Sequence, residues 1–487
     1  MVALLIGLLT SAGLLLRGGW DVWAQSFFFL AVACGTSLWL LWRVLVGYVP
    51  LPPRRLLAWA ASLALLAGAA SFASPVGTYA ATAWRSLLLG LWIFVALAVV
   101  GKDQRLWIDR AIRAAAWVLA LLAFYQHYHD GLARPSSALL NQNVFAGTIL
   151  MLLALAAQQR DWLLAAALLT CLWWAHSVGA WLGLAAALVL TRRSSETVGN
   201  YVGMAVGFVC LLILYGKLQS PDVVHRWFWW KAAWRMSLAR PLFGFGPGSY
   251  AYVAPCYFEP GHGLSSLYAH EHFLELAAEN GWPYVFLWAA GLAHFLRRGS
   301  PHKRFAALAV LVQALWDYPL SIPANFWLFC YLAGSATPET SRGVNVSYER
   351  KWPWAVAVLA VGAGLSILAG RAWRADWLKA RAVEGFEAGE PARMTLDRLD
   401  RSLRLAPDPE AERAFAEVLL AAKPAPSRSA VEQAALHLER SARLNPYRPS
   451  TWLALNRLYA DLGEPGRGER LEHEGRLSCP ALWAAAP

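Results

Sequence analysis

The residues best suited to chemistry lie in one short segment, from Tyr268 to Tyr284. It holds two histidines and three glutamates: His270, His272, Glu271, Glu275 and Glu279. An imidazole ionises near neutral pH, so a histidine at the water boundary can accept a proton from a reacting hydroxyl. We interpret His270 as a candidate general base, with His272 beside it as a candidate substrate contact.

The same segment does not match a zinc-peptidase site. That motif places histidines at positions i and i+4 of a helix, but the fourth residue after His270 is Leu274. A site of two histidines and a glutamate that includes His262 is the alternative left open. We expect neither a metal nor a cofactor.

A basic stretch precedes the histidines, from Leu218 to Ala269. Its basic residues are Arg226, Lys231, Arg235 and Arg240, and its only acidic residues are Asp222 and Glu259. Guanidinium groups pair bidentately with phosphate, so the arginines predict a phosphate or diphosphate partner. Alternatively they anchor lipid headgroups beside an aromatic belt of Trp227, Trp229, Trp230 and Trp234.

Three glycines follow Arg240 in close succession, at Gly244, Gly246 and Gly248. Glycine lets the backbone turn sharply and approach a ligand closely. The spacing does not match the dinucleotide-binding fingerprint, because no strand precedes it and no helix follows in register.

The composition excludes an ordinary soluble enzyme. Only 15% of the 487 residues are charged, the net charge is +12 and the mean hydropathy is +0.39. Charge is unevenly spread, because roughly 10% of residues 1–370 but about 30% of residues 371–487 are charged. We predict a membrane domain over 1–370 and a soluble helical domain over 371–487.

The apolar stretches predict about 12–13 membrane helices. We place them at 2–16, 21–42, 56–73, 84–101, 111–126, 143–159, 162–176, 179–191, 199–217, 271–296, 304–318, 322–336 and 353–370. Lys and Arg gather on alternate loops, which the positive-inside rule assigns to the cytoplasm. The large loop 218–269 is then external, and with an odd number of spans so is the C-terminal domain.

The six cysteines show no CxxC pair and no regular spacing. Most lie in apolar runs, where cysteine behaves as a small hydrophobic residue. Cys256 and Cys479 fall outside those runs and could pair with each other.

The tail contains an internal sequence repeat. The segment Arg401–Pro407 is similar to the segment Arg440–Pro446, about 39 residues later, and this offset is near the length of a helical-hairpin repeat. The pattern resembles a tetratricopeptide repeat, with a generic helical bundle as the alternative. In either case we interpret the tail as a docking or packing module.

Three motifs together resemble the O-antigen ligase and polymerase superfamily. His270, Gly281 and Tyr284 match the spacing of its histidine motif, although Glu271 departs at the second position. The segment Leu140–Gly147 is similar to its Asn-Pro-Asn segment, with Gln142 in place of proline, and Ser177–Leu184 resembles a Ser-Arg-Gly phrase in which Val178 replaces the arginine.

The resemblance implies an all-α, GT-C-like polytopic fold in the bacterial inner membrane, with the large loop and the tail facing the periplasm. It implies transfer of a glycan from a polyprenyl-diphosphate-linked donor to a hydroxyl of a glycan, lipid or protein acceptor. His270 matches the catalytic histidine and Arg226 best matches the diphosphate-binding arginine. The further candidate substrate contacts are Arg235, Arg240, His272, Arg134 and Asn143.

Partners are expected to be that donor, the acceptor, membrane lipids and a protein docked on the tail, with no nucleic acid. The alternative to an enzyme is a non-catalytic scaffold or polysaccharide-export component that recruits partners through its tail. The missing arginine at Val178 favours this alternative, and Arg134 or His176 would have to supply the charge in an active enzyme.

Overall fold

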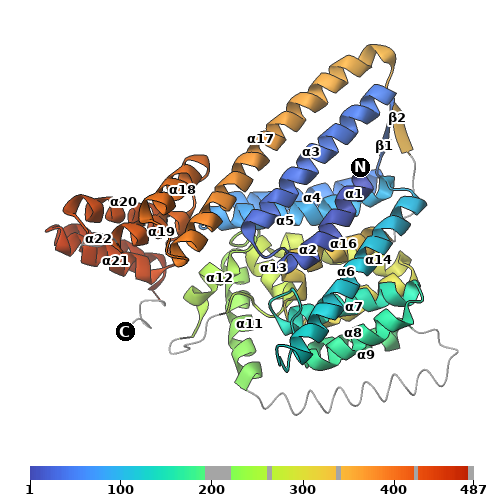
Figure 1. Ribbon diagram of the computed structural model, residues 1–487, viewed down its shortest axis with the longest axis horizontal. Helices are drawn as coiled ribbons and strands as arrows, with labels where there is room; N and C mark the ends of the chain where they lie inside the picture. Colours follow the sequence, from blue (N-terminus) through green and yellow to red (C-terminus); the bar gives the residue numbers. More distant parts are fainter. Residues whose placement is uncertain (192–220, 260–265, 336–341, 422–425, 481–487) are drawn as a thin grey trace.

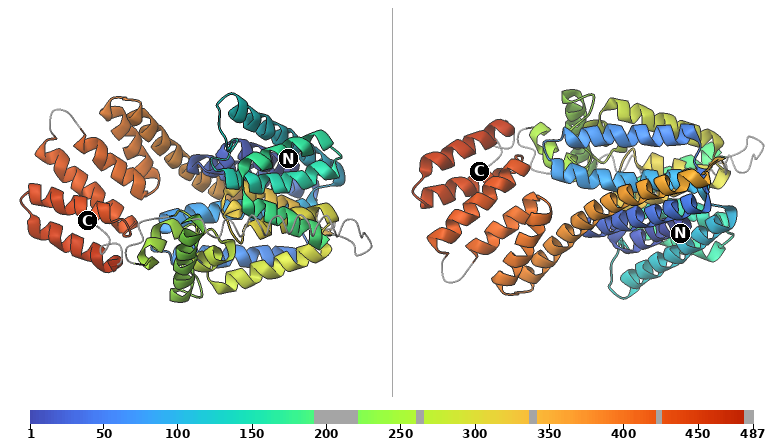
Figure 2. Two further views of the ribbon diagram at one scale, coloured as in Figure 1. Left: turned by 90° about the horizontal axis from the view of Figure 1, so that it is seen from below. Right: turned by 90° about the horizontal axis from the view of Figure 1, so that it is seen from above.

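The computed structural model describes residues 1–191, 221–259, 266–335, 342–421 and 426–480. These residues form an all-α fold with one small two-stranded sheet, which confirms the predicted fold class (Figure 1). The helices fall into a membrane body and a tail grouped at one end of it (Figure 2).

Four described helices are long and apolar enough to cross a membrane. They are α3 (Val22–Val46), α4 (Arg54–Phe72), α5 (Gly77–Ala96, extended by the 3₁₀ turn Leu97–Val99) and α17 (Tyr348–Glu387). Much of their apolar surface is exposed, as in Leu65 and Val361, which are 72% and 64% exposed. Such surface suits contact with lipid.

Further helices complete the body. They are the helical run Val2–Leu15, α6 (Lys102–Tyr128), α7 (Gln142–Gln158), α8 (Trp162–Ala175), α9 (Val178–Thr191), α14 (Trp282–Arg298), α15 (Pro301–Gln313) and α16 (Pro323–Gly334). The core lies around α7 and α16, because nearly every residue of these two helices is buried. The predicted spans up to 179–191 each contain a helix, and 199–217 lies outside the described residues.

Two predicted spans differ from the structure. The span 271–296 is two helices, α13 (His272–Asn280) and α14, because Gly281 breaks them with φ 80° and ψ 167°. The span 304–318 ends early, since α15 stops at Gln313 and a turn carries the chain to Pro319.

The described part of the segment 218–269 is largely helical, although we predicted a loop. It contains α11 (Pro221–Ala239), α12 (Tyr250–Val253) and the 3₁₀ turn Ala254–Tyr257. In Figure 1, α11 runs across the direction of α4 and α5. One face of α11 is exposed through Val224, Trp227, Trp234 and Leu238, and the opposite face is buried through Ala232, Ala233 and Met236.

At the far end of the body, β1 (Tyr48–Leu51) pairs antiparallel with β2 (Arg342–Asn345). This pairing joins the end of α3 to the start of α17, and the two helices then pack along their length (Figure 1). Gly362 permits the close approach, because a Cβ there would lie 2.6 Å from the Ser37 side chain.

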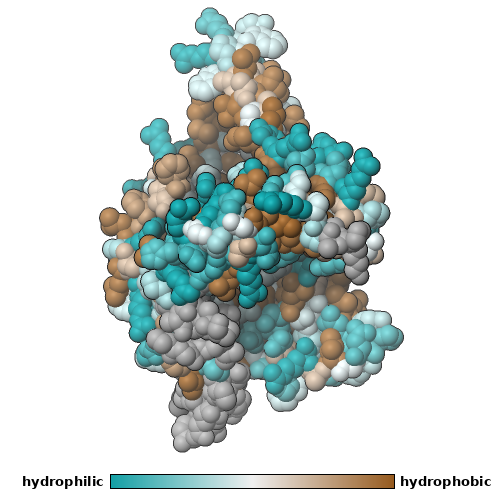
Figure 3. Space-filling view, turned by 90° about the vertical axis from the view of Figure 1, so that its left-hand side faces the viewer, coloured by the Kyte–Doolittle hydropathy of each residue, from teal (hydrophilic) through white to brown (hydrophobic). Residues whose placement is uncertain are grey.

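The tail is a stack of antiparallel helices that continues from α17. It comprises α18 (Ala392–Leu405), α19 (Pro409–Leu420), α20 (Arg428–Leu444), α21 (Pro449–Asp461) and α22 (Pro465–Ser478). The boundary that we predicted after residue 370 lies inside the continuous helix α17. Seen from the tail end, the outer face is largely hydrophilic, with hydrophobic surface above it (Figure 3). The tetratricopeptide resemblance stays a prediction.

Glu410 at the start of α19 anchors the tail to the body. Its carboxylate accepts hydrogen bonds from the Tyr79 hydroxyl at 2.6 Å and from Arg448 at 2.9 Å. Burial favours the neutral acid, but these hydrogen bonds hold the pKa of Glu410 below its usual value. Tyr79 also stacks on Tyr252 of α12, with ring centroids 3.8 Å apart.

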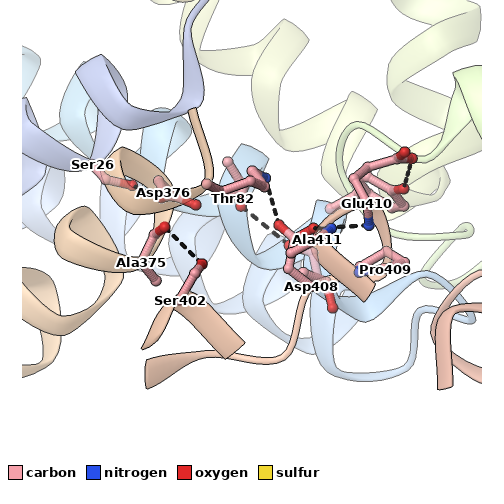
Figure 4. A network of polar contacts seen from close by, with 12 residues as sticks. Ser26, Thr82, Ala375, Asp376, Ser402, Asp408, Pro409, Glu410 and Ala411 are labelled. Carbon is pink, nitrogen blue, oxygen red and sulfur yellow. Dashed lines mark hydrogen bonds and ion pairs between the residues drawn. The ribbon is translucent and has the colours of Figure 1, made fainter. Parts of the chain in front are cut away.

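A second set of polar contacts lies where α17 enters the tail (Figure 4). Asp376 accepts a hydrogen bond from Ser26 at 2.6 Å, and Lys379 pairs with Asp408. Ser402 of α18 donates to the carbonyl of Ala375 at 2.8 Å. The tail is therefore fixed both where α17 enters it and where Glu410 contacts the body.

A disulfide completes the attachment by joining Cys256, just after α12, to Cys479, just after α22. The pairing that the sequence left open is present. It places the tail and the α12 segment at the same end of the body, opposite the β1–β2 sheet (Figures 1 and 2).

We expect Cys256→Ser, Cys479→Ser and the double variant to lose the same stability, about 2–4 kcal/mol, because each removes the same cross-link. Thermal unfolding of the detergent-purified protein measures this loss, and a reductant should lower the wild-type Tm but not that of the double variant. Cys34→Ser is the control, since Cys34 is a free cysteine. An unchanged Tm in all cysteine variants would contradict the prediction.

Candidate functional site

His270 faces a buried carboxylate. His270 lies on the link before α13, and its Nδ1 lies 3.4 Å from Oδ1 of Asp317, on the turn after α15. The His270 side chain is 15% exposed and that of Asp317 only 4%. A carboxylate in this place can orient an imidazole through Nδ1, which leaves Nε2 for a reacting hydroxyl.

Arg226 of α11 approaches the same carboxylate. Its Nη1 donates to the carbonyl of Trp316 at 2.6 Å, and its Nη2 lies 3.9 Å from Oδ2 of Asp317. The side chain is 18% exposed, so it is anchored on one side and accessible on the other. A guanidinium has five N–H donors, which leaves several for an anionic ligand.

Aromatic rings enclose His270. Trp229 of α11 stacks on the imidazole with centroids 4.8 Å apart, and Tyr318 meets it edge-on at 4.7 Å. Tyr318 in turn stacks on Tyr268 at 4.4 Å. Because aromatic neighbours restrict the ring on both sides, His270 has little freedom to rotate.

The predicted aromatic belt on α11 is divided between two faces. Trp229 and Trp230 point inward, where Trp230 Nε1 donates to the carbonyl of His270 at 3.3 Å. Trp227 and Trp234 point outward and are 55% and 46% exposed. Only the outward pair suits a membrane interface.

The glycine turn supports the helix that follows His270. Phe245 N–H donates to the carbonyl of Ala278 at 3.0 Å, and Gly246 N–H donates to that of Glu279 at 2.7 Å. A Cβ on Gly281 would clash with the carbonyl oxygen of Leu242. The backbone around Gly244 and Gly246 thus lies close to α13, and the approach to a ligand that we predicted for these glycines stays a prediction.

Arg235 and Arg240 lie apart from the contacts of His270. Arg235 donates to the carbonyl of Tyr257 at 3.0 Å and pairs with Glu259 at 3.3 Å. Arg240 donates to the carbonyl of Ala73 at 3.2 Å and lies over the Phe245 ring. Arg235 therefore contacts the segment after α12, and Arg240 contacts the end of α4.

The other three candidates differ in their surroundings. His272 is buried, and its main-chain N–H donates to the carbonyl of Ala314 at 2.9 Å. Asn143, at the start of α7, accepts a hydrogen bond on its carbonyl from Gln313 Nε2 at 2.8 Å. Arg134 is exposed on the link between α6 and α7.

Sequence reasoning missed Asp317. The available signal was a lone acid between two apolar stretches, since an ionisable residue at such a place calls for a partner.

The segment that contains Val178 borders the same turn. A Cβ added to Gly179 would lie 3.8 Å from the Cβ atom of Trp316. In the described ranges no three metal-ligating side chains cluster, and His262 lies outside those ranges.

We expect Gly281→Ala to destabilise the protein by about 3 kcal/mol or more, because it adds a clash to backbone strain. Gly389→Ala is the matched control, with the same φ of 80° and open space around it. It should cost about 1 kcal/mol. Thermal unfolding compares the two, and equal losses would show that the contact with Leu242 is unimportant.

The comparisons with known proteins concern the segment that carries part of this site. Residues 144–289, from α7 into α14, match the family model described as O-antigen ligase. No curated protein matches the chain. The matched residues include His270 and Arg226, whereas Asp317 lies beyond them. The matched domain supports the resemblance of the chain to the O-antigen ligase-like superfamily.

Proposed function

We propose that the protein transfers a glycan from a polyprenyl-diphosphate-linked donor to an acceptor hydroxyl. An O-antigen ligase domain supports a ligase- or polymerase-like glycosyltransferase role in general. The observation that carries the finer proposal is the contact of His270 with Asp317, with Arg226 on the same carboxylate. A base and a cation beside each other suit displacement of a diphosphate.

In the proposed step, Nε2 of His270 accepts the proton of the acceptor hydroxyl as its oxygen bonds to the anomeric carbon. The bond from that carbon to the diphosphate oxygen breaks, and its electron pair leaves with the polyprenyl diphosphate. Arg226 neutralises the charge that develops on the leaving phosphate, and Asp317 stabilises the imidazolium. The donor brings a good leaving group, so positioning and charge account for most of the catalysis.

The outward face of α11 supports a membrane-anchored donor. Val224, Trp227, Trp234 and Leu238 form one exposed apolar stripe, and α11 lies across the spanning helices (Figure 1). A helix of this kind lies in the plane of the membrane interface. Arg226 on its other face would then meet a diphosphate at headgroup depth.

We infer that the site and the tail face the periplasm. The opposite end of the body, around the β1–β2 sheet, holds the end of α3, the starts of α4 and α17, and β2 (Figure 1). These elements carry Arg43, Arg54, Arg342, Arg350 and Lys351 there. Clustered basic residues mark the cytoplasmic side of a membrane protein. A disulfide between Cys256 and Cys479 is also expected in an oxidising compartment.

The remaining predicted substrate contacts stay predictions. They are Arg235, Arg240, His272, Arg134 and Asn143. The scaffold alternative rests on Val178 and on the tail, and it requires His270 to be dispensable. The product of the following assay identifies the acceptor as a glycan, a lipid or a protein.

Membranes that contain His270→Ala should transfer lipid-linked glycan about 10²–10⁴-fold more slowly than wild type, because the base is lost. Asp317→Asn and Arg226→Ala should also lose activity. Arg235→Ala is the matched arginine on the same helix and should lose less, since its guanidinium is exposed and bound to Glu259. Gel analysis of product at equal protein abundance measures this, and full transfer by His270→Ala would support the scaffold alternative.

The orientation is tested with single introduced cysteines at exposed arginines. Arg393→Cys in the tail should react with a membrane-impermeant maleimide in spheroplasts. Arg350→Cys, near the β1–β2 sheet, should react only after permeabilisation. The unsubstituted chain gives the background. Labelling in the reverse order would place the site in the cytoplasm.

A further inference from the structure

We propose that Glu275 is a positioning residue that sets His270 against Asp317, an inference that rests on the proposed function. Glu275 lies on α13, one helical turn after the link that carries His270. The residue is only 5% exposed, so its carboxylate is not accessible to a substrate.

The Glu275 carboxylate bridges the two segments that form the site. One oxygen, Oε2, accepts the N–H of Ala269 at 2.7 Å, and Ala269 directly precedes His270. The other, Oε1, accepts the hydroxyl of Ser321 at 2.5 Å, four residues after Asp317. Both oxygens are thus committed to positions that flank the His270–Asp317 pair.

His270 needs such support because its backbone is strained. Its φ is 57°, in the left-handed region that non-glycine residues rarely adopt. Strain of this kind persists only where surrounding contacts hold it in place. The contacts are the Ala269 N–H bond to Glu275, the Trp230 bond to the His270 carbonyl and the His272 N–H bond to Ala314.

A glutamine at position 275 should preserve almost all of the positioning role of Glu275. Its amide oxygen can accept the Ala269 N–H, and its amide nitrogen can donate to the Ser321 hydroxyl, which both donates and accepts. Alanine cannot, and it would leave a buried N–H and a buried hydroxyl unpaired. A positioning role therefore tolerates Glu275→Gln, whereas a proton-transfer role for Glu275 would not.

Glu279 offers a matched control. It is a buried glutamate one turn further along α13, and its carboxylate accepts the N–H of Tyr250 at 3.0 Å. It therefore ties α13 to α12 rather than to the link before His270. Replacing its carboxyl with an amide tests burial and helix stability without removing a hydrogen bond to the His270 link.

The experiment measures kcat and KM for glycan transfer in purified full-length variants. We expect Glu275→Ala to lower kcat about 100-fold, the order expected for a misplaced catalytic group, with KM little changed. Glu275→Gln and Glu279→Gln should stay close to wild type. Ser321→Ala, a milder change to the same bridge, should give a smaller loss of kcat and serves if Glu275→Ala does not insert.

A double variant separates positioning from general destabilisation. If Glu275 acts through His270, adding Glu275→Ala to His270→Ala should lower the residual rate no further. Three results would overturn the inference. The first is a further loss of rate when Glu275→Ala is added to His270→Ala, and the second is a wild-type kcat in both Glu275→Ala and Ser321→Ala. The third is a Glu275→Gln variant that is as slow as Glu275→Ala. A wild-type protein without transfer overturns the proposed function itself, whereas normal transfer by Glu275→Ala overturns only the role of Glu275.

Discussion

A bilayer offers no water to backbone N–H and C=O groups, so spanning segments must be helical and polar chemistry must gather where helices end. The site follows this constraint. His270 lies on a link before α13, Asp317 on the turn after α15, and Arg226 on α11, which crosses the spanning helices. Each side chain comes from a place where the backbone leaves the regular membrane helices.

The tail extends the same end of the body. Glu410 binds both Tyr79 of α5 and Arg448 of the tail, and Cys256 is covalently joined to Cys479. Because Tyr250 of α12 donates to the carbonyl of Trp229 at 3.1 Å, the disulfide-linked segment also contacts the helix that covers His270. The tail is therefore joined to the body in two ways. It continues from α17 along the chain, and it also contacts the segments that surround the site.

Much of the fold was predictable, because apolar stretches of spanning length can satisfy their backbone only as helices. The break at Gly281 was missed because the apolar residues of α13 and α14 together have the length of one span, although Glu279, Asn280 and Pro283 lie beside the glycine. Cys256 and Cys479 could be singled out by their polar surroundings, but their pairing across 223 residues depends on how the tail docks.

At the site, sequence alone determined the residues whose chemistry and spacing are local. His270 and Arg226 belong to this group, since motif spacing and an arginine-rich stretch are visible along one segment. Tertiary structure decided their partners. Asp317 lies 47 residues from His270 in the chain, and it meets Nδ1 only because α13 packs beside the end of α15. Contacts between distant segments depend on packing geometry, which composition and periodicity do not contain.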